Sequence, residues 1–203
     1  MTTWTAQTEY ATNLLPYSED FSLWTLASNV SLQPGQTDPF GQPSAVRITD
    51  TSSAAFGQVL YTLNLDGTVT RVFSAFVMKD SDTSRVCSIR MNYTGGVSMS
   101  IRLNTYTGEV ATVTGSGITL VNHGVDDYDS AWRIYVASYK DTLVNVGLLP
   151  SNATTLSSSA SVSIKGSATF FGAQLEVGTD PTGYIKTEGV SVTSKKLTEW
   201  ARQ

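Results

Sequence analysis

The chain contains almost none of the residues that most metal sites and covalent catalytic centres use. Among its 203 residues there is one cysteine, Cys87, and one histidine, His123. A single cysteine excludes a disulfide within the chain and a cysteine-based zinc site, and a single histidine excludes a cluster of histidine ligands. No serine stands in a G-x-S-x-G turn, so the nucleophile motif of α/β-hydrolases is absent. These absences argue against several classes of enzyme.

Charge is also scarce in this sequence. Charged residues make up 15% of the chain, and 13 basic residues stand against 17 acidic ones, for a net charge of −4. A nucleic-acid-binding protein needs a basic surface for the phosphates, so we expect no nucleic-acid partner. No apolar run approaches the ~18 residues of a membrane-spanning helix, so we expect no membrane partner. The first twelve residues lack the basic and apolar segments of a signal peptide.

What the chain does contain favours β-structure. Hydrophobic residues make up 40% of it, and Ser, Thr and 16 Gly residues suit strands and turns. The segment 85–93 alternates apolar and polar residues, Gly95-Gly96 predicts a turn, and the segment 97–103 resumes the alternation. About ten short segments of this kind, without a long helical pattern, predict an all-β sandwich or barrel. The proline-rich segment 33–43 predicts a loop, and only the tail 194–203 has helical composition.

Three segments in order carry a family resemblance. They are N-L-L-P-Y-S-E-D-F-S-L-W at 13–24, D-S-A-W-R-I-Y-V at 129–136, and F-F-G-A-Q-L-E-V-G-T-D-P-T-G-Y-I-K-T at 170–187. This set resembles the carbohydrate-binding-module-like jelly-roll domains of tailed-bacteriophage virion proteins, which include tail fibres, tail-associated proteins and head decoration proteins. The resemblance implies a jelly-roll β-sandwich of about ten antiparallel strands and an origin in a virion. The third segment, whose alternate residues from Phe171 to Val177 would point inward, is the most specific.

The resemblance covers most of the chain and leaves two short ends. We expect an N-terminal anchoring arm over residues 1–12, the sandwich over 13–193, and a C-terminal tail over 194–203. The arm is polar except for Trp4 and Tyr10. An exposed arm has no need of two large aromatic side chains, so we expect Trp4 and Tyr10 to anchor the chain on a particle. The alternative is that both ends lie along their own sandwich.

Acidic residues gather in one short polar segment that predicts a loop. Asp126, Asp127 and Asp129 supply the carboxylate oxygens that Ca²⁺ prefers, and jelly rolls of the resembled kind often carry a structural Ca²⁺. The spacing matches no EF-hand, and the alternative is a solvated turn before a strand. Apart from this candidate calcium site, we expect no cofactor.

A glycan site would use exposed aromatic rings for stacking and polar side chains for the sugar hydroxyls. The candidates are Tyr93, Tyr106 and Tyr128 for stacking, with Arg90 and Arg102 on the polar face of the predicted hairpin. The alternative is that the tyrosines belong to the rim of the sheets and that the arginines are solvated. The sequence does not choose between these interpretations.

Three functions follow from these observations. The first is a non-enzymatic structural component of a bacteriophage virion, a head decoration or tail-associated subunit held by other virion proteins. We expect it to be a homo-oligomer, with a trimer as the first guess. The second is a receptor- or glycan-binding module that attaches the virion to sugars of the bacterial surface. The third, a polysaccharide hydrolase, needs two carboxylates at a controlled separation, and no pattern in the sequence pairs them.

Overall fold

The segments in which apolar and polar residues alternate form β-strands, as the sequence predicts. The computed structural model describes residues 4–5, 8–66, 68–83, 86–157, 163–197 and 201–202. Its clearest hairpin joins β8 (Val86–Tyr93) to β9 (Val97–Leu103). Gly95 and Gly96 form the turn with φ of +79° and +72°, a conformation that suits glycine. The predicted hairpin is confirmed.

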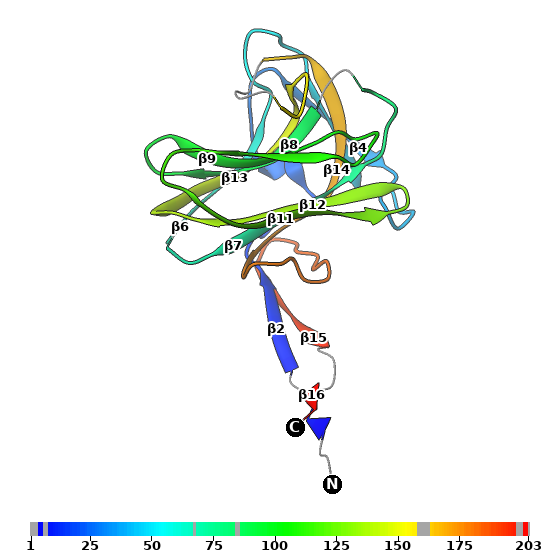
Figure 1. The fold of residues 1–203 in the computed structure, drawn as a ribbon. Helices are drawn as coiled ribbons and strands as arrows, with labels where there is room; N and C mark the ends of the chain where they lie inside the picture. The colour runs from blue at the N-terminus through cyan, green and yellow to red at the C-terminus, as the bar shows by residue number, and fades with distance from the viewer. Residues whose placement is uncertain are drawn as a thin grey trace.

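Two six-stranded antiparallel sheets pack face to face (Figure 1). Sheet I has the order β10-β9-β8-β13-β6-β3, and sheet II has the order β11-β12-β7-β14-β5-β4. The further strands of sheet I are β3 (Thr25–Leu26), β6 (Val59–Asp66), β10 (Val110–Thr114) and β13 (Thr142–Ala153). Those of sheet II are β4 (Val30–Gln36), β5 (Ala45–Asp50), β7 (Arg71–Met78), β11 (Thr119–Tyr128), β12 (Ala131–Tyr139) and β14 (Gly166–Val177).

The chain crosses repeatedly from one sheet to the other, which gives a jelly-roll sandwich. β5 to β8 alternate between the sheets, and so do β12, β13 and β14. One core lies between the sheets and includes Phe21, Phe73, Ile89 and Phe170. Burying each such side chain stabilises the fold by about 1.5–3 kcal/mol. The predicted all-β jelly-roll sandwich is therefore confirmed.

Two local predictions are wrong at the edges of sheet II. The segment 33–43 is not all loop, because β4 runs through Pro34 to Gln36. β4 is an edge strand, where a proline that lacks an N–H is tolerated. The predicted acidic loop is also largely strand, because β11 continues to Tyr128, which pairs with Ala131.

The two ends of the chain form a ribbon that projects from the sandwich. β2 (Thr8–Asn13) pairs antiparallel with β15 (Val192–Leu197), and β1 (Trp4–Thr5) pairs with β16 (Ala201–Arg202). β1 and β16 lie at the end of this ribbon that is far from the sandwich (Figure 1). We call these four strands the stalk. The helical composition of the tail is misleading, because the described part of residues 194–203 is extended in pairing with β1 and β2.

Asn13 is the residue at which the stalk meets the sandwich. Its buried side-chain nitrogen donates to the carbonyls of Ala173 (3.2 Å) and Ile185 (3.0 Å). Its side-chain oxygen accepts from the backbone N–H groups of Leu15 and Leu175, each at 3.1 Å. An amide has two donors and two acceptor lone pairs, so all of its hydrogen-bonding capacity is used. Asn13 thus joins β2, β14 and the segment that leads back to β15.

A second polar cluster explains the third segment of the family resemblance. The buried carboxylate of Glu176 accepts from Thr182 N (3.1 Å), Thr182 Oγ1 (2.5 Å) and Gln174 Nε2 (2.7 Å). Gln174 Oε1 accepts from Ile185 N (2.7 Å), and Arg133 Nη1 donates to the carbonyl of Thr182 (2.6 Å). These bonds hold the chain that follows β14 against the outer face of sheet II.

β14 has a bulge at Gly172, just before the polar residues Gln174 and Glu176. The register shifts between Phe171 and Gln174, and Gly172 has a φ of +61°. Phe171 therefore joins the outer-face rings of Phe76 and Tyr184, while Ala173 and Leu175 face the core. The prediction that Phe171 points inward is wrong, because this bulge shifts the alternation by one position. The prediction for Val177 is also wrong, since its side chain is exposed.

Replacing Asn13 should destabilise the whole protein. Asn13→Ala leaves two buried carbonyls and two buried N–H groups without the amide, and we expect a loss of about 3 kcal/mol in the free energy of unfolding. The matched control is Asn122→Ala, whose amide bonds Thr179 and Asp180 at the surface and should cost less than about 1 kcal/mol. Urea unfolding measures both, and equal losses would contradict the role given to Asn13.

Replacing Gly172 should cost more than backbone strain alone. A Cβ at Gly172 would lie 3.0 Å from Tyr184 Cε2 and 3.1 Å from Phe76 Cδ2. Gly41 has a φ of +80° but no atom within 4 Å of the same position, so Gly41→Ala carries the strain without the crowding. We expect losses of about 3 kcal/mol for Gly172→Ala and about 1 kcal/mol for Gly41→Ala in urea unfolding. A Gly172→Ala loss no larger than that of Gly41→Ala would show that the aromatic rings move aside.

Candidate functional site

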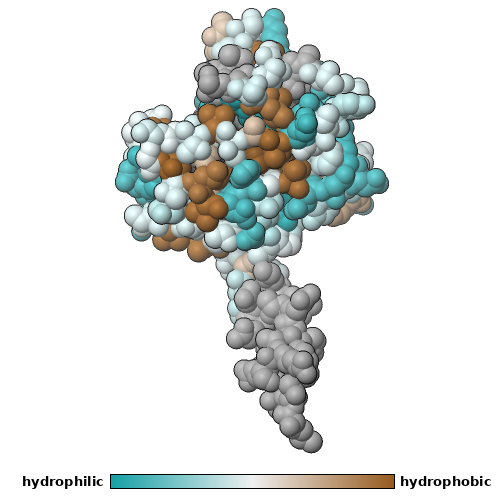
Figure 2. Space-filling model, viewed as in Figure 1, coloured by the Kyte–Doolittle hydropathy of each residue, from teal (hydrophilic) through white to brown (hydrophobic). Residues whose placement is uncertain are grey.

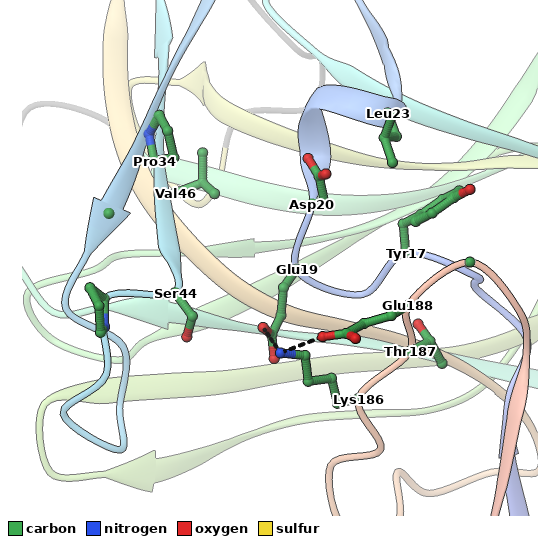
Figure 3. Close-up of a pocket in the computed structure, with 13 residues that line it drawn as sticks. Tyr17, Glu19, Asp20, Leu23, Pro34, Ser44, Val46, Lys186, Thr187 and Glu188 are labelled. Atoms are coloured by element: carbon green, nitrogen blue, oxygen red, sulfur yellow. Dashed lines mark ion pairs between the residues drawn. The ribbon is translucent and has the colours of Figure 1, made fainter.

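A groove of about 560 Å³ lies where the stalk joins the sandwich (Figure 3). One side comes from β4, the start of β5 and the segment before β5. The other side comes from the segments just inside Asn13 and β15, which are tied together by the Tyr17–Glu188 bridge and by a 2.7 Å bond from Gly189 N to the carbonyl of Pro16. The apolar lining residues are Tyr17, Leu23, Pro34, Pro43 and Val46, and the charged ones are Glu19, Asp20, Lys186 and Glu188. We call it the stalk-base groove.

The charged residues of the stalk-base groove neutralise one another in part. Lys186 Nζ lies 3.1 Å from Glu19 Oε2 and 2.8 Å from Glu188 Oε1 (Figure 3), and these bonds raise the pKa of Lys186. The hydroxyl of Tyr184 donates to Glu19 Oε1 at 2.8 Å, and burial raises the pKa of that tyrosine. Glu19 is therefore bonded through both oxygens. The groove offers an apolar floor with a charged rim, which suits docking of protein better than acid–base chemistry.

A second hollow, of about 430 Å³, lies on the outer face of sheet I. β8 and β13 supply most of its polar lining, and the register places Asn92 directly opposite Asn145, with a 2.5 Å bond from Asn92 Nδ2 to Asn145 Oδ1. The lining residues are Gln58, Arg90, Asn92, Tyr93, Thr94, Gly95, Gly96, Val144 and Asn145. We call it the β8–β13 hollow.

The two predicted arginines are neighbours beside this hollow. Arg90 pairs with Ser100 across β8 and β9, and Arg102 pairs with Ser88, so both side chains lie diagonally on the outer face. Arg90 Nε donates to Ser100 Oγ at 3.1 Å. Burial, and secondarily the charge of Arg102, lower the pKa of Arg90 to about 10. Arg102 is fully buried, and burial lowers its pKa as well. With a pKa of about 10, the guanidinium of Arg90 stays protonated at neutral pH.

The three predicted tyrosines do not join these arginines on one surface. Tyr93 is only 2% exposed, and its hydroxyl bonds Ser138 Oγ across the core at 2.9 Å. Tyr106 is 59% exposed in the turn after β9. Tyr128 is 38% exposed at the end of β11 and packs edge-on against the outer-face ring of Phe76, with 5.0 Å between centroids. The ring of Tyr93 is therefore not available for stacking, and the other two belong to different elements.

The predicted calcium ligands are spread over β11 and the turn that follows it. Asp127 Oδ1 lies 2.6 Å from Lys79 Nζ and accepts from Asp129 N at 2.9 Å, and the Lys79 bond lowers the pKa of Asp127. Asp126 pairs in register with Arg133. In the part of the chain that the structure describes, no three His, Cys, Asp or Glu side chains gather as a metal site. The structure does not test calcium binding, so the calcium site and its alternative, a solvated segment without a metal ion, both stay predictions.

The predicted anchoring residues both lie in the stalk. Tyr10 is on β2 and its side chain is 63% exposed. Trp4 is on β1, and its side chain lies outside the described part of the structure. The described residues contain no helix long and apolar enough to cross a membrane.

Several residues of these sites carry no signal in the sequence. Asn92 and Asn145 are 53 positions apart and meet only because β8 and β13 are neighbours in sheet I. Glu19 and Lys186 are brought together by the return of the chain past Asn13. The resemblance that covers residues 13–193 locates these segments but not their contacts.

Comparisons with known proteins add little to the geometry. No protein-family model and no curated protein matches the chain. One similar solved structure is described as "Structural analysis of an exo-beta-agarase", with a TM-score of 0.41 and 11% sequence identity. The match covers 83% of this chain and 25% of that one, so this chain spans about a quarter of that protein's length. The class that the chain's own structure defines is a jelly-roll β-sandwich with a stalk formed by both chain ends.

Removing calcium should leave the thermal stability unchanged. Asp127 is held by Lys79 and by the backbone of Asp129, so its carboxylate already has partners. We expect the same Tm in EDTA and in millimolar CaCl₂, measured by differential scanning calorimetry. A Tm that rises with CaCl₂ in the natural protein but not in Asp127→Asn would instead establish the calcium site.

Proposed function

We propose that this protein is a non-enzymatic structural component of a bacteriophage virion, a head decoration or tail-associated subunit held in place through its stalk. The stalk is the observation that carries the structural role. The virion assignment is supported by the resemblance of segments 13–24, 129–136 and 170–187 to phage jelly-roll domains.

The stalk is built in a way that calls for a partner. An isolated two-stranded ribbon is marginally stable in water, and sheets generally need three strands or a packed face. In the described part of the chain, β2 and β15 pair only with each other, so each has one open edge of N–H and C=O groups. Such edges bind a further strand readily. A neighbouring subunit that adds strands to the stalk would stabilise it and hold the sandwich.

Other surfaces can add to this attachment. The stalk-base groove lies on the sandwich beside the base of the stalk, so a neighbour that contacts this base also reaches the apolar residues of the groove. Brown, apolar surface gathers across the front of the sandwich in Figure 2. Separately, Val121 of the edge strand β11 has an exposed side chain. Weak contacts of this kind become strong when the symmetry of a particle or a homotrimer repeats them.

The chemistry of the described residues supports the non-enzymatic part of the proposal. A glycoside hydrolase needs one carboxylate that protonates the leaving group and another that acts as base or nucleophile. Glu19 and Glu188 do share the stalk-base groove, but both are ion-paired to Lys186. Both carboxylates are thus engaged in ion pairs with the same lysine.

A second candidate function is a receptor- or glycan-binding module. It is favoured by the β8–β13 hollow, whose amides, hydroxyl and guanidinium are the groups that bind sugar hydroxyls. Its volume of about 430 Å³ lies within the usual range of ligand sites, roughly 300–1,000 Å³. This function is compatible with attachment through the stalk, because the two use different strands.

Truncation of the stalk tests the structural role. Deleting residues 1–12 and 193–203 removes the paired strands but keeps Asn13 and its bonds. We expect the truncated protein to keep its β-type circular dichroism spectrum, to become a monomer of the sandwich alone by light scattering, and to lose co-sedimentation with stripped phage particles. The matched control is Gly41→Ala, which leaves the stalk unchanged and should bind like the natural protein.

The opposite outcomes are equally clear. A folded, truncated protein that binds particles as well as the natural protein would exclude the stalk as the anchor. Natural protein that binds no particle would overturn the virion proposal and favour the second candidate function.

A further inference from the structure

The β8–β13 hollow has a cation at one wall. Arg90 lies on β8 directly opposite Gly147 of β13 on one side and Ser100 of β9 on the other. The hydrogen-bonded amides of Asn92 and Asn145 lie two residues further along, on the same two strands. The guanidinium is therefore positioned by central strands rather than by a flexible loop, which keeps its geometry fixed.

The charge of this hollow is opposite to that of the protein as a whole. Among the described residues that line it, Arg90 is the charged one and no carboxylate is present, in a chain with a net charge of −4. Arg102 lies behind Arg90 on the same face and is fully buried. Burial is the main cause of the lowered pKa of Arg90, and the charge of Arg102 adds to it. An anion beside Arg90 is attracted by both charges through a medium that screens less than water.

The other groups of the hollow suit a sugar. Side-chain amides of Gln58, Asn92 and Asn145 both donate and accept, as sugar hydroxyls require. Gly95 and Gly96 also line the hollow, and no atom lies within 4 Å of a Cβ built on either, so the turn leaves room for a ring. A polyphosphate is disfavoured, because the described lining of the hollow supplies a single cation and the whole chain is acidic.

We propose that the β8–β13 hollow binds a saccharide that carries a carboxylate or a sulfate group, with Arg90 bonding the anion and the amides of Asn92 and Asn145 bonding neighbouring hydroxyls. The planar guanidinium matches the two oxygens of either anion. Arg102 contributes through its charge and does not contact the sugar. This inference rests on the second candidate function, and it specifies the class of glycan.

Isothermal titration at low salt tests the inference with defined oligosaccharides. The probes are oligogalacturonates, which carry carboxylates, sulfated carrageenan oligosaccharides, and neutral cello-oligosaccharides of similar length. We expect at least one anionic series to bind at least tenfold more tightly than the neutral one, and its affinity to fall as salt is added. The preferred series then identifies carboxylate or sulfate as the source of the charge.

Three variants assign the binding to the hollow. Arg90→Gln removes the cation and should weaken anionic binding at least tenfold. Arg47→Gln removes the same charge from the exposed surface of β5 in sheet II and should bind like the natural protein. Asn145→Asp adds a carboxylate of nearly the same shape to the hollow and should also weaken anionic binding at least tenfold. Circular dichroism melting checks that each variant is folded, and Asn145→Asp decides the matter if Arg90→Gln does not fold.

The failures of the two proposals are distinguishable. Equal affinity for anionic and neutral oligosaccharides, or anionic binding unchanged in Arg90→Gln and Asn145→Asp, would overturn this inference and leave glycan binding in place. No binding of any probe by the natural protein would overturn both this inference and the second candidate function, and it would leave the structural role of the stalk untouched.

Discussion

The buried amide of Asn13 is the interaction on which the arrangement of the chain ends depends. It bonds Ala173 and Leu175 of β14 and Ile185 of the returning segment, and so fixes where β2 leaves the sandwich. Since β15 follows that returning segment, the same amide sets the point at which β2 and β15 leave the sandwich. A buried amide with every donor and acceptor bonded has one acceptable position, because moving it would leave several polar groups unsatisfied at once.

The outer face of sheet II extends this constraint. Gln174 and Glu176 alternate with core residues after the bulge at Gly172, and they hold Thr182 and Ile185 by their backbone groups. The rings of Phe76, Phe171 and Tyr184 pack over the same face. What the sequence presents as a family signature is therefore a clamp that returns the chain to Asn13. It stabilises the base of the stalk.

The two proposed functions use two kinds of surface. The stalk has open strand edges, which recognise another polypeptide through backbone bonds and give strong attachment when symmetry repeats them. The β8–β13 hollow has fixed side chains on central strands, which recognise a small ligand through charge and amide geometry. A virion subunit that is held by one and binds a surface sugar with the other needs no conformational change between the two.

The sequence by itself determined the strands, because alternation with period two is a local property that segments such as 85–103 display directly, and the resemblance supplied the jelly roll. It located Arg90 and Arg102 on one polar face, but it placed Tyr93 in a glycan site although the same alternation turns that ring into the core. Only the tertiary structure decided that the ends pair as a stalk, that Phe171 faces outward, and that Asn92 meets Asn145. Each of these depends on contacts between residues distant in sequence or on a one-residue bulge, and neither leaves a periodic trace in the chain.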